Sequence, residues 1–214
     1  MARQTAGLGT TDGGAPLETA VEQVKRLGYD PRDVRDIVVT HLDADHIGGL
    51  VDFSEANVHV YAEELQALWE PRGRVERTRY RAVQFTHGPH WTSYADAGEP
   101  WFGFEAVREL KGLPPEILLI PLAGHSRGHA GMAVDTGAGW LLHAGDSYFH
   151  HDELDSARPH CPPGLAMFQT LVQADRRARR GNQRRLLDLV RDHGDQVTVF
   201  SAHCAAELHA FTGA

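Results

Sequence analysis

The most constraining feature of this chain is a short apolar strand that leads directly into four side chains able to bind metal ions. The β-branched run Asp36–Thr40 is typical of a buried strand. His41, Asp43, Asp45 and His46 follow it within six residues. On extended backbone, alternate side chains point the same way, and burying two carboxylates without a cation would be costly. The segment therefore predicts a site that holds two cations side by side.

A polar surface loop with incidental histidines is the alternative interpretation of this segment. That interpretation would suffice for a single His-x-Asp pair. Here, however, the polar string lies between an apolar strand and the small residues Gly48 and Gly49, which permit a tight approach of the next element. This context favours metal binding.

Three more side chains of the kinds that bind metals follow predicted strands. They are His125 after Ile117–Leu122, Asp146 after Trp140–His143, and His203 after Gln196–Ser201. Ligand sites of α/β proteins collect where strands end. We therefore expect these three side chains to join the first four.

The rest of the chain alternates between helices and strands without an internal repeat. Predicted elements are a helix over Leu17–Leu27, a strand over Asn57–Tyr61, a helix over Ala62–Trp69, a strand over Ala130–Asp135, two helices within Leu165–His193 that part near Gly181 and Asn182, and a short C-terminal helix. The segment Pro71–Trp101 contains Gly-Pro breakers, and we expect an irregular insertion with some helix. This pattern predicts one α/β domain over residues 1–214.

Composition bounds the class of protein. Hydrophobic residues make up 42% and charged residues 23% of the chain, which indicates a globular domain rather than a disordered one. The net charge of -8 argues against a dedicated nucleic-acid binder, so we expect no nucleic-acid partner. No apolar run reaches the roughly 20 residues that span a bilayer, and residues 1–16 lack the apolar core of a secretory signal, so we expect no membrane partner and a cytoplasmic location. Cys161 and Cys204 are too few for a disulfide framework and are expected to be free thiols.

The order of these residues resembles that of the hydrolases with the metallo-β-lactamase fold. Those proteins carry an HxHxDH loop, a histidine in a GH-x-x-GH loop, a Gly-Asp after a strand, and a late histidine. The resemblance covers the chain from about Leu17 onward and is strongest to the branch of quorum-quenching lactonases and glyoxalase II. It implies an αββα sandwich and two divalent metals. His41, Asp43 and His125 would hold one metal, Asp45, His46 and His203 would hold the other, and Asp146 would bridge them.

Two departures from the family pattern change what the resemblance implies. Asp43 stands where the family motif has its second histidine. A third carboxylate should make the first metal a weaker Lewis acid and admit harder ions, so zinc is the default expectation, with manganese or iron(II) as alternatives. The family fold also begins with strands that end in Asp-Thr-Gly, whereas Gly7–Thr10 resembles the residues just after that stretch. The first edge strands therefore look absent, and an exposed sheet edge is expected.

The resemblance implies hydrolysis without a protein nucleophile. A hydroxide that bridges the metals would attack a carbonyl carbon. Asp45 would act as the catalytic residue by orienting this nucleophile and passing its proton to the leaving group. The expected substrate is a small-molecule ester, lactone or thioester. In the lactonases a tyrosine three residues after the bridging aspartate polarises the carbonyl, but here that position is Phe149, and Tyr148 is one residue early.

Other functions fit parts of the sequence. Phosphodiesterase or nuclease chemistry at the same site is supported by the arginine-rich run 176–185, although arginines on an exposed helical face are usually solvated. An oxygen-reducing di-iron protein shares an acidic residue at the second motif position but usually carries a flavin-binding domain, for which this chain has no room. A non-catalytic relative that keeps a metal for structure is a further alternative. For the oligomeric state, a homodimer is one alternative.

Overall fold

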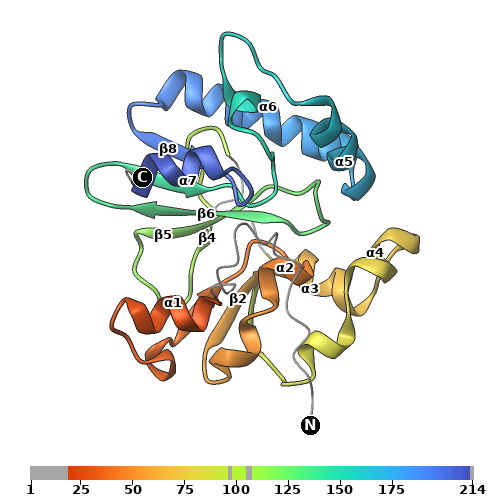
Figure 1. Ribbon diagram of the computed structural model, residues 1–214, viewed down its shortest axis with the longest axis vertical. Helices are drawn as coiled ribbons and strands as arrows, with labels where there is room; N and C mark the ends of the chain where they lie inside the picture. The colour runs from red at the N-terminus through yellow and green to blue at the C-terminus, as the bar shows by residue number, and fades with distance from the viewer. Residues whose placement is uncertain (1–18, 96–97, 105–107, 213–214) are drawn as a thin grey trace, which may run out of the picture.

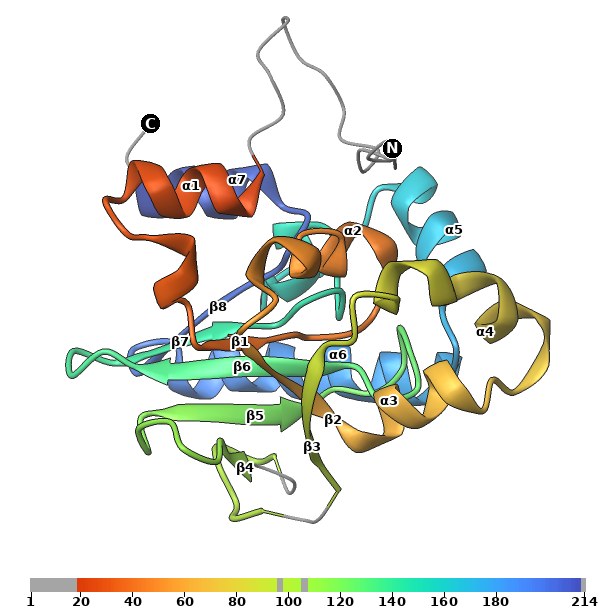
Figure 2. The ribbon, with the colours of Figure 1, turned by 90° about the horizontal axis from the view of Figure 1, so that it is seen from below.

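Two β-sheets pack against each other, and helices cover their outer faces (Figure 1, Figure 2). The computed structural model describes residues 19–95, 98–104 and 108–212. In the three-stranded sheet the parallel strands are, in order, β1 (Asp36–Val38), β2 (Asn57–Tyr61) and β3 (His90–Tyr94). The five-stranded sheet has the order β4 (Arg108–Glu109), β5 (Ile117–Pro121), β6 (Ala130–Asp135), β7 (Trp140–His143) and β8 (Val197–Phe200), and its neighbours are antiparallel except for β7 and β8.

The helices divide between the two outer faces. In Figure 1, α5 (Pro163–Val172), α6 (Arg176–His193) and α7 (Ala205–Thr212) lie on the side of the five-stranded sheet. On the side of the three-stranded sheet lie α1 (Ala20–Arg26), α2 (Ala44–Ile47), α3 (Ala62–Trp69) and α4 (Gly73–Arg79). α6 packs on β8, and α3 packs on β2 and β3. The predicted αββα sandwich is thereby confirmed.

Strand β5 shows why an entirely apolar segment folds as an inner strand. Alternate residues of a strand face opposite sides. Leu118 and Ile120 belong to the same buried cluster as Leu186 of α6, whereas Leu119 shares a buried cluster with Tyr94 of β3. Because both faces are buried, every position requires an apolar residue. The cluster that contains Leu119 joins the two sheets.

The segment Pro71–Trp101 is more regular than predicted. It contains α4, a 3-10 turn at Ala82–Phe85, and β3, so the prediction of an irregular insertion is wrong for β3. In the described part of the sheet, β3 pairs with β2 alone. Tyr94 is its one buried residue, so the strand lacks the apolar alternation by which strands are recognised. Pairing with β2, rather than local pattern, makes this segment a strand.

The break between α5 and α6 lies at residues 173–175 rather than at the predicted Gly181 and Asn182, which lie inside α6. Asp175 caps α6, because its carboxylate accepts hydrogen bonds from two amides of the first turn. Gly181 has open space around it and adopts helical backbone. The cap therefore sets the helix boundary, and the glycine does not.

The expectation of absent edge strands concerns the outer side of β1. Among the described residues, β1 pairs only with β2. The stretch Gly7–Thr10 that prompted the expectation lies outside the described residues, as does the start of the helix predicted over Leu17–Leu27. The described helix, α1, buries none of its side chains.

The core between the sheets should be sensitive to truncation of Leu119. Its side chain is fully buried, and cutting a buried leucine back to alanine costs about 2–5 kcal/mol. We expect Leu119→Ala to lower the free energy of unfolding by that amount in urea denaturation. Leu171→Ala, at an exposed position of α5, is the control and should change it by less than about 0.5 kcal/mol. Equal effects of the two substitutions would contradict the sandwich arrangement.

Candidate metal centre

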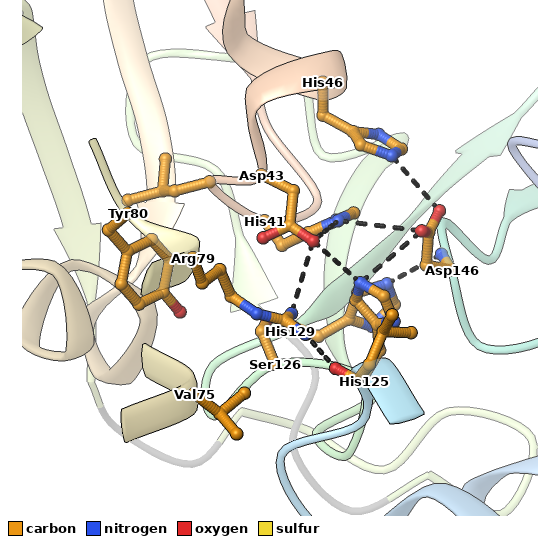
Figure 3. Close-up of polar contacts among 12 residues, drawn as sticks. His41, Asp43, His46, Val75, Arg79, Tyr80, His125, Ser126, His129 and Asp146 are labelled. Carbon is orange, nitrogen blue, oxygen red and sulfur yellow. Dashed lines mark hydrogen bonds and ion pairs between the residues drawn. The ribbon is translucent and has the colours of Figure 1, made fainter. Parts of the chain in front are cut away.

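The predicted ligands gather where strands of both sheets end. β5, β7 and β8 point the same way, because β6 is antiparallel to β5 and β7, and β7 is parallel to β8. The loops after these strands carry His125, Asp146 and His203, and the loop after β1 carries His41. Figure 3 shows the side chains of His41, His125 and Asp146 converging. The site therefore lies at an edge of the kind where α/β folds bind ligands.

His41, His125 and Asp146 form a buried group of metal-binding side chains. Oδ2 of Asp146 lies 3.5 Å from Nε2 of His125 and 3.8 Å from Nε2 of His41. Asp43 stands outside this trio, but its Oδ2 lies 3.0 Å from Nε2 of His125 and 3.6 Å from Nε2 of His41. Ligands about 2.1 Å from a tetrahedral zinc ion lie roughly 3.4 Å from one another. The spacing of these atoms is therefore compatible with one shared cation.

Asp45, His46 and His203 form a second group. Oδ2 of Asp45 lies 3.7 Å from Nε2 of His46 and 3.6 Å from Nε2 of His203. Asp146 faces this group with its other oxygen, because Oδ1 lies 3.2 Å from Nε2 of His46 and 3.4 Å from Nε2 of His203. The two oxygens of one carboxylate therefore face two separate groups.

Several buried polar atoms of these side chains lack a hydrogen bond of normal geometry. They are Nε2 of His41, Nε2 of His46, Oδ1 of Asp43 and Oδ1 of Asp146. Buried polar atoms are normally paired, and these four unpaired atoms lie together on predicted ligands. Imidazole nitrogens and carboxylate oxygens suit zinc, manganese or iron(II). The residues present therefore fit divalent cations.

Asp45 reaches the site from a helix rather than from extended backbone. α2 begins at Ala44, so the prediction that His41, Asp43 and Asp45 alternate along one extended stretch is wrong for Asp45. The turn into α2 directs Asp45 and His46 toward the second group and leaves His41 and Asp43 with the first. The side chain of Asp45 is 56% exposed, whereas that of Asp146 is 4% exposed. Asp45 is thus the most exposed carboxylate of the site.

Contacts within the site hold Asp146 in its charged form. Burial alone would raise the pKa of Asp146, but the close imidazoles of His203 and His46 bring that pKa below its usual range. The close carboxylate of Asp146 raises the pKa of His203. Burial would lower the pKa of His46, yet its contact with Asp146 raises that pKa overall. A carboxylate kept ionised in this way also attracts a cation.

His129 supports Asp146 in a ring form that its own hydrogen bonds define. The backbone amide of Asp146 donates to Nε2 of His129 at 2.9 Å, and Nδ1 of His129 donates to the carbonyl oxygen of Leu122 at 3.0 Å. Burial lowers the pKa of His129, which agrees with a neutral ring. Both nitrogens are occupied, so His129 is a support for the site and not a ligand.

A fully buried carboxylate that the sequence analysis missed joins the ligand loops. Oε1 of Glu64 accepts hydrogen bonds from the amide of Leu42 and the hydroxyl of Tyr80, both at 3.0 Å. Oε2 accepts from the hydroxyl of Ser126 at 2.7 Å and from the amide of Gly128 at 3.0 Å. Leu42 lies in the loop after β1, whereas Ser126 and Gly128 lie in the loop after β5. Glu64 therefore fixes the two loops relative to each other.

Close backbone contacts also hold the loop that carries His125. A Cβ atom at Gly128 would lie 1.9 Å from the amide nitrogen of Glu64. A Cβ atom at Gly124 would lie 2.3 Å from the amide nitrogen of Arg179. Real Cβ atoms do not approach other atoms so closely. Both glycines of the GHSRGH motif are therefore required by neighbouring helices.

The two aromatic residues that follow Asp146, at positions 148 and 149, present no free hydroxyl group to the site. Tyr148 is fully buried, and its hydroxyl donates to Glu207 at 2.7 Å. The ring of Phe149 stacks on that of His203 with centroids 5.3 Å apart, and it lies 6.0 Å from the ring of His125. Phe149 therefore forms an apolar wall beside the ligands.

In the arginine-rich run of α6, four arginines are exposed, as a solvated helical face predicts, whereas Arg179 and Arg185 pack inward. The exposed ones are Arg176, Arg177, Arg180 and Arg184. Arg179 is buried and donates to Gln169 of α5. Arg185 lies over the ring of Phe104 at 4.3 Å and donates to the carbonyl oxygen of Gly103. These two arginines pack the helix against its neighbours and do not form part of a free basic surface.

The Glu64 contacts should make an almost isosteric substitution damaging. Each oxygen accepts two hydrogen bonds, so the amide nitrogen of a glutamine would face two donors. A buried donor left unpaired costs about 1–3 kcal/mol, and we expect Glu64→Gln to lower the free energy of unfolding by about 2–4 kcal/mol in urea denaturation. Glu63→Gln, an exposed neighbour on α3, is the matched control. A Glu64→Gln variant as stable as this control would show that the four hydrogen bonds do not hold the loops.

Comparison with a known sequence and with solved structures extends this description. The probable metallo-hydrolase Rv2300c of Mycobacterium tuberculosis is 41% identical to this chain over 186 residues. Those residues cover 87% of this chain and 60% of the relative, so the chain spans about 60% of the length of that protein.

Two solved lactonase structures share the fold. A mutant of AiiA from B. thuringiensis with N-decanoyl-L-homoserine bound at its active site superimposes with a TM-score of 0.64 at 19% identity, and covers 89% of this chain and 64% of that one. AidC, a dizinc quorum-quenching lactonase, gives a TM-score of 0.62 at 16% identity and covers 89% of this chain and 65% of that one. Residues 7–192 match the family model of the metallo-beta-lactamase superfamily. The chain therefore belongs to the metallo-β-lactamase superfamily.

Proposed function

We propose that this protein is a metal-dependent hydrolase with a dinuclear site that cleaves a small ester, lactone or thioester. The observation that carries the proposal is the position of Asp146 between two groups of ligand side chains. Its Oδ2 lies 3.5 Å from His125, and its Oδ1 lies 3.2 Å from His46. A carboxylate with one oxygen toward each group supports a role in contact with both cations.

The residues divide in the proposal as the two groups divide in space. His41, Asp43 and His125 would hold one cation, Asp45, His46 and His203 the other, and Asp146 would contact both. Such a pair of cations supplies an activated water and an electrophile for a carbonyl oxygen. His129 fixes the backbone of Asp146 through its amide hydrogen bond. Glu64 holds the two ligand loops at a set separation.

Asp45 is the residue proposed to move a proton. Its side chain is the most exposed of the three carboxylates in the site. One oxygen lies toward His46 and His203, while solvent reaches the group. A carboxylate in this position can hold a proton taken from water and release it to a leaving group.

The substrate class is proposed from the site and from the relatives. Phe149 presents an apolar ring beside His203, which suits the organic part of a small ester or lactone. The AiiA mutant carries N-decanoyl-L-homoserine at its active site, and AidC is a lactonase. Tyr148 is engaged by Glu207, so the carbonyl group of a substrate would not be polarised by this tyrosine.

The alternative of phosphodiesterase or nuclease chemistry gains no specific support. Its argument was the arginine-rich helix, where Arg179 and Arg185 pack internally and the four exposed arginines form a face of the kind that is usually solvated. Among the described residues, no helix is long and apolar enough to cross a bilayer. Zinc as the resident metal, a homodimer and a cytoplasmic location stay predictions.

Metal content tests the dinuclear site directly. We expect elemental analysis to find about two divalent ions per chain in the purified protein. Asp146→Ala removes the carboxylate shared by the two groups, so its metal content should fall to about one ion or fewer. Asp195→Ala, at an exposed position before β8, should keep the content of the unaltered protein. Unchanged metal content in Asp146→Ala would refute a bridging role.

Removal of metal should abolish hydrolysis. We expect turnover of at least one member of a panel of small lactones, esters and thioesters, loss of that turnover after dialysis against a chelator, and recovery on addition of zinc, manganese or iron(II). A bis-aryl phosphodiester in the same panel tests the alternative chemistry. Two bound metals without turnover of any carbonyl substrate would favour the non-catalytic relative.

A further inference from the structure

Asp43, the residue that departs from the family motif, lies against a buried guanidinium from α4. Nη1 of Arg79 lies 3.3 Å from Oδ2 of Asp43. The side chain of Arg79 is only 7% exposed and that of Asp43 is 19% exposed. Figure 3 shows Arg79 reaching toward Asp43 on the side away from Asp146. Removing one partner of a buried ion pair destabilises a protein far more than removing one partner of a surface ion pair, because the other charge stays buried and unpaired.

One further contact holds the guanidinium, and another holds the helix that carries it. Its Nη2 donates to the carbonyl oxygen of Val172, at the end of α5. Three residues earlier on α4, the buried carboxylate of Glu76 accepts a hydrogen bond at 3.0 Å from Nε of Arg127, in the loop that carries His125. Residues three apart on a helix share a face. α4 therefore docks on the site through Glu76 and Arg79 together.

Within the described chain, Asp43 is the one carboxylate at ion-pair distance from Arg79. Nη1 of Arg79 has no hydrogen bond of normal geometry to any described residue, so its one close partner is the carboxylate of Asp43. If Asp43 were neutral, a positive charge would be buried beside the ligands of the first group without a partner. The identity of residue 43 is thus tied to the presence of arginine at residue 79.

We propose that Arg79 is a positioning residue that neutralises and orients Asp43, so that the Asp43–Arg79 pair takes the place of the neutral second histidine of the family motif. Three carboxylates and one guanidinium leave the site with the net charge of two carboxylates. The expectation that a third carboxylate weakens the first metal as a Lewis acid then does not hold. The part of this inference that concerns metal binding rests on the proposed function. The part that concerns the ion pair rests only on the contact between Arg79 and Asp43.

A cycle of four proteins tests the pair. These are the unaltered protein, Asp43→His, Arg79→Met and the double variant. Asp43→His restores the family motif but leaves the guanidinium unpaired beside the cations, so we expect it to bind the first metal at least about tenfold more weakly and to hold fewer ions per chain. The double variant should regain the metal content of the unaltered protein. An Asp43→His variant that already holds the full content would overturn the proposal.

Thermal unfolding of the four metal-free proteins provides a second measurement that needs neither metal nor turnover. We expect the double variant to melt at a higher temperature than either single variant, because each single substitution leaves one buried charge without its partner. Losses that simply add would overturn the proposal. If the unaltered protein binds no metal, the proposed function fails while this measurement still decides on the pair.

One control variant and one alternative variant complete this experiment. Arg77→Met, at an exposed position on α4, should alter neither the metal content nor the melting temperature. If Asp43→His does not fold, Asp43→Asn replaces it in the cycle, with the same expected order of melting temperatures. Rescue by the second substitution is the result that a merely structural role for α4 would not produce.

Discussion

The buried carboxylate of Glu64 is the interaction on which the geometry of the candidate centre depends. It takes hydrogen bonds from three segments that are separate in sequence: the loop after β1, the residue that follows α4, and the loop after β5. A carboxylate without solvent contact is tolerated when donors surround it in this way. Because α3 also packs on β2 and β3, the three-stranded sheet and the ligand loops form one connected unit. The metal-binding side chains inherit their positions from that unit.

The charges of the site balance one another before any cation binds. Burial would raise the pKa of both Asp43 and Asp146, but the neighbouring imidazoles bring both pKa values below the usual range. The same contacts raise the pKa of His46 and His203. A cation entering this arrangement would compete with protons for the histidine nitrogens. The ion pair between Asp43 and Arg79 extends the balance one layer outward.

The spacing of apolar residues along the chain predicted the elements whose own sequence determines their structure. β2, α3, β6 and β7 have the predicted bounds. The seven potential ligands were recognised because each follows the end of a predicted strand, and their role as ligands stays a prediction. Failures occurred where a distant partner decides. β3 is a strand because it pairs with β2, and nothing near Arg79 in the sequence points to Asp43. Glu64 could have been recognised, since it shares the buried face of α3 with Ala67 and Leu68.

The close approach of Gly128 to Glu64 limits how far this centre is modular. A GHSRGH loop grafted onto another scaffold would carry its histidines but not the helix whose backbone passes beneath it. Without that helix, the donors of Ser126 and Gly128 would lose the carboxylate that they share. The smallest transferable unit therefore includes α3 and the start of α6 as well as the loop, because Gly124 lies against the backbone of Arg179. A redesign of the site can therefore change the side chains that face the substrate, but it must keep the backbone conformation of the loop.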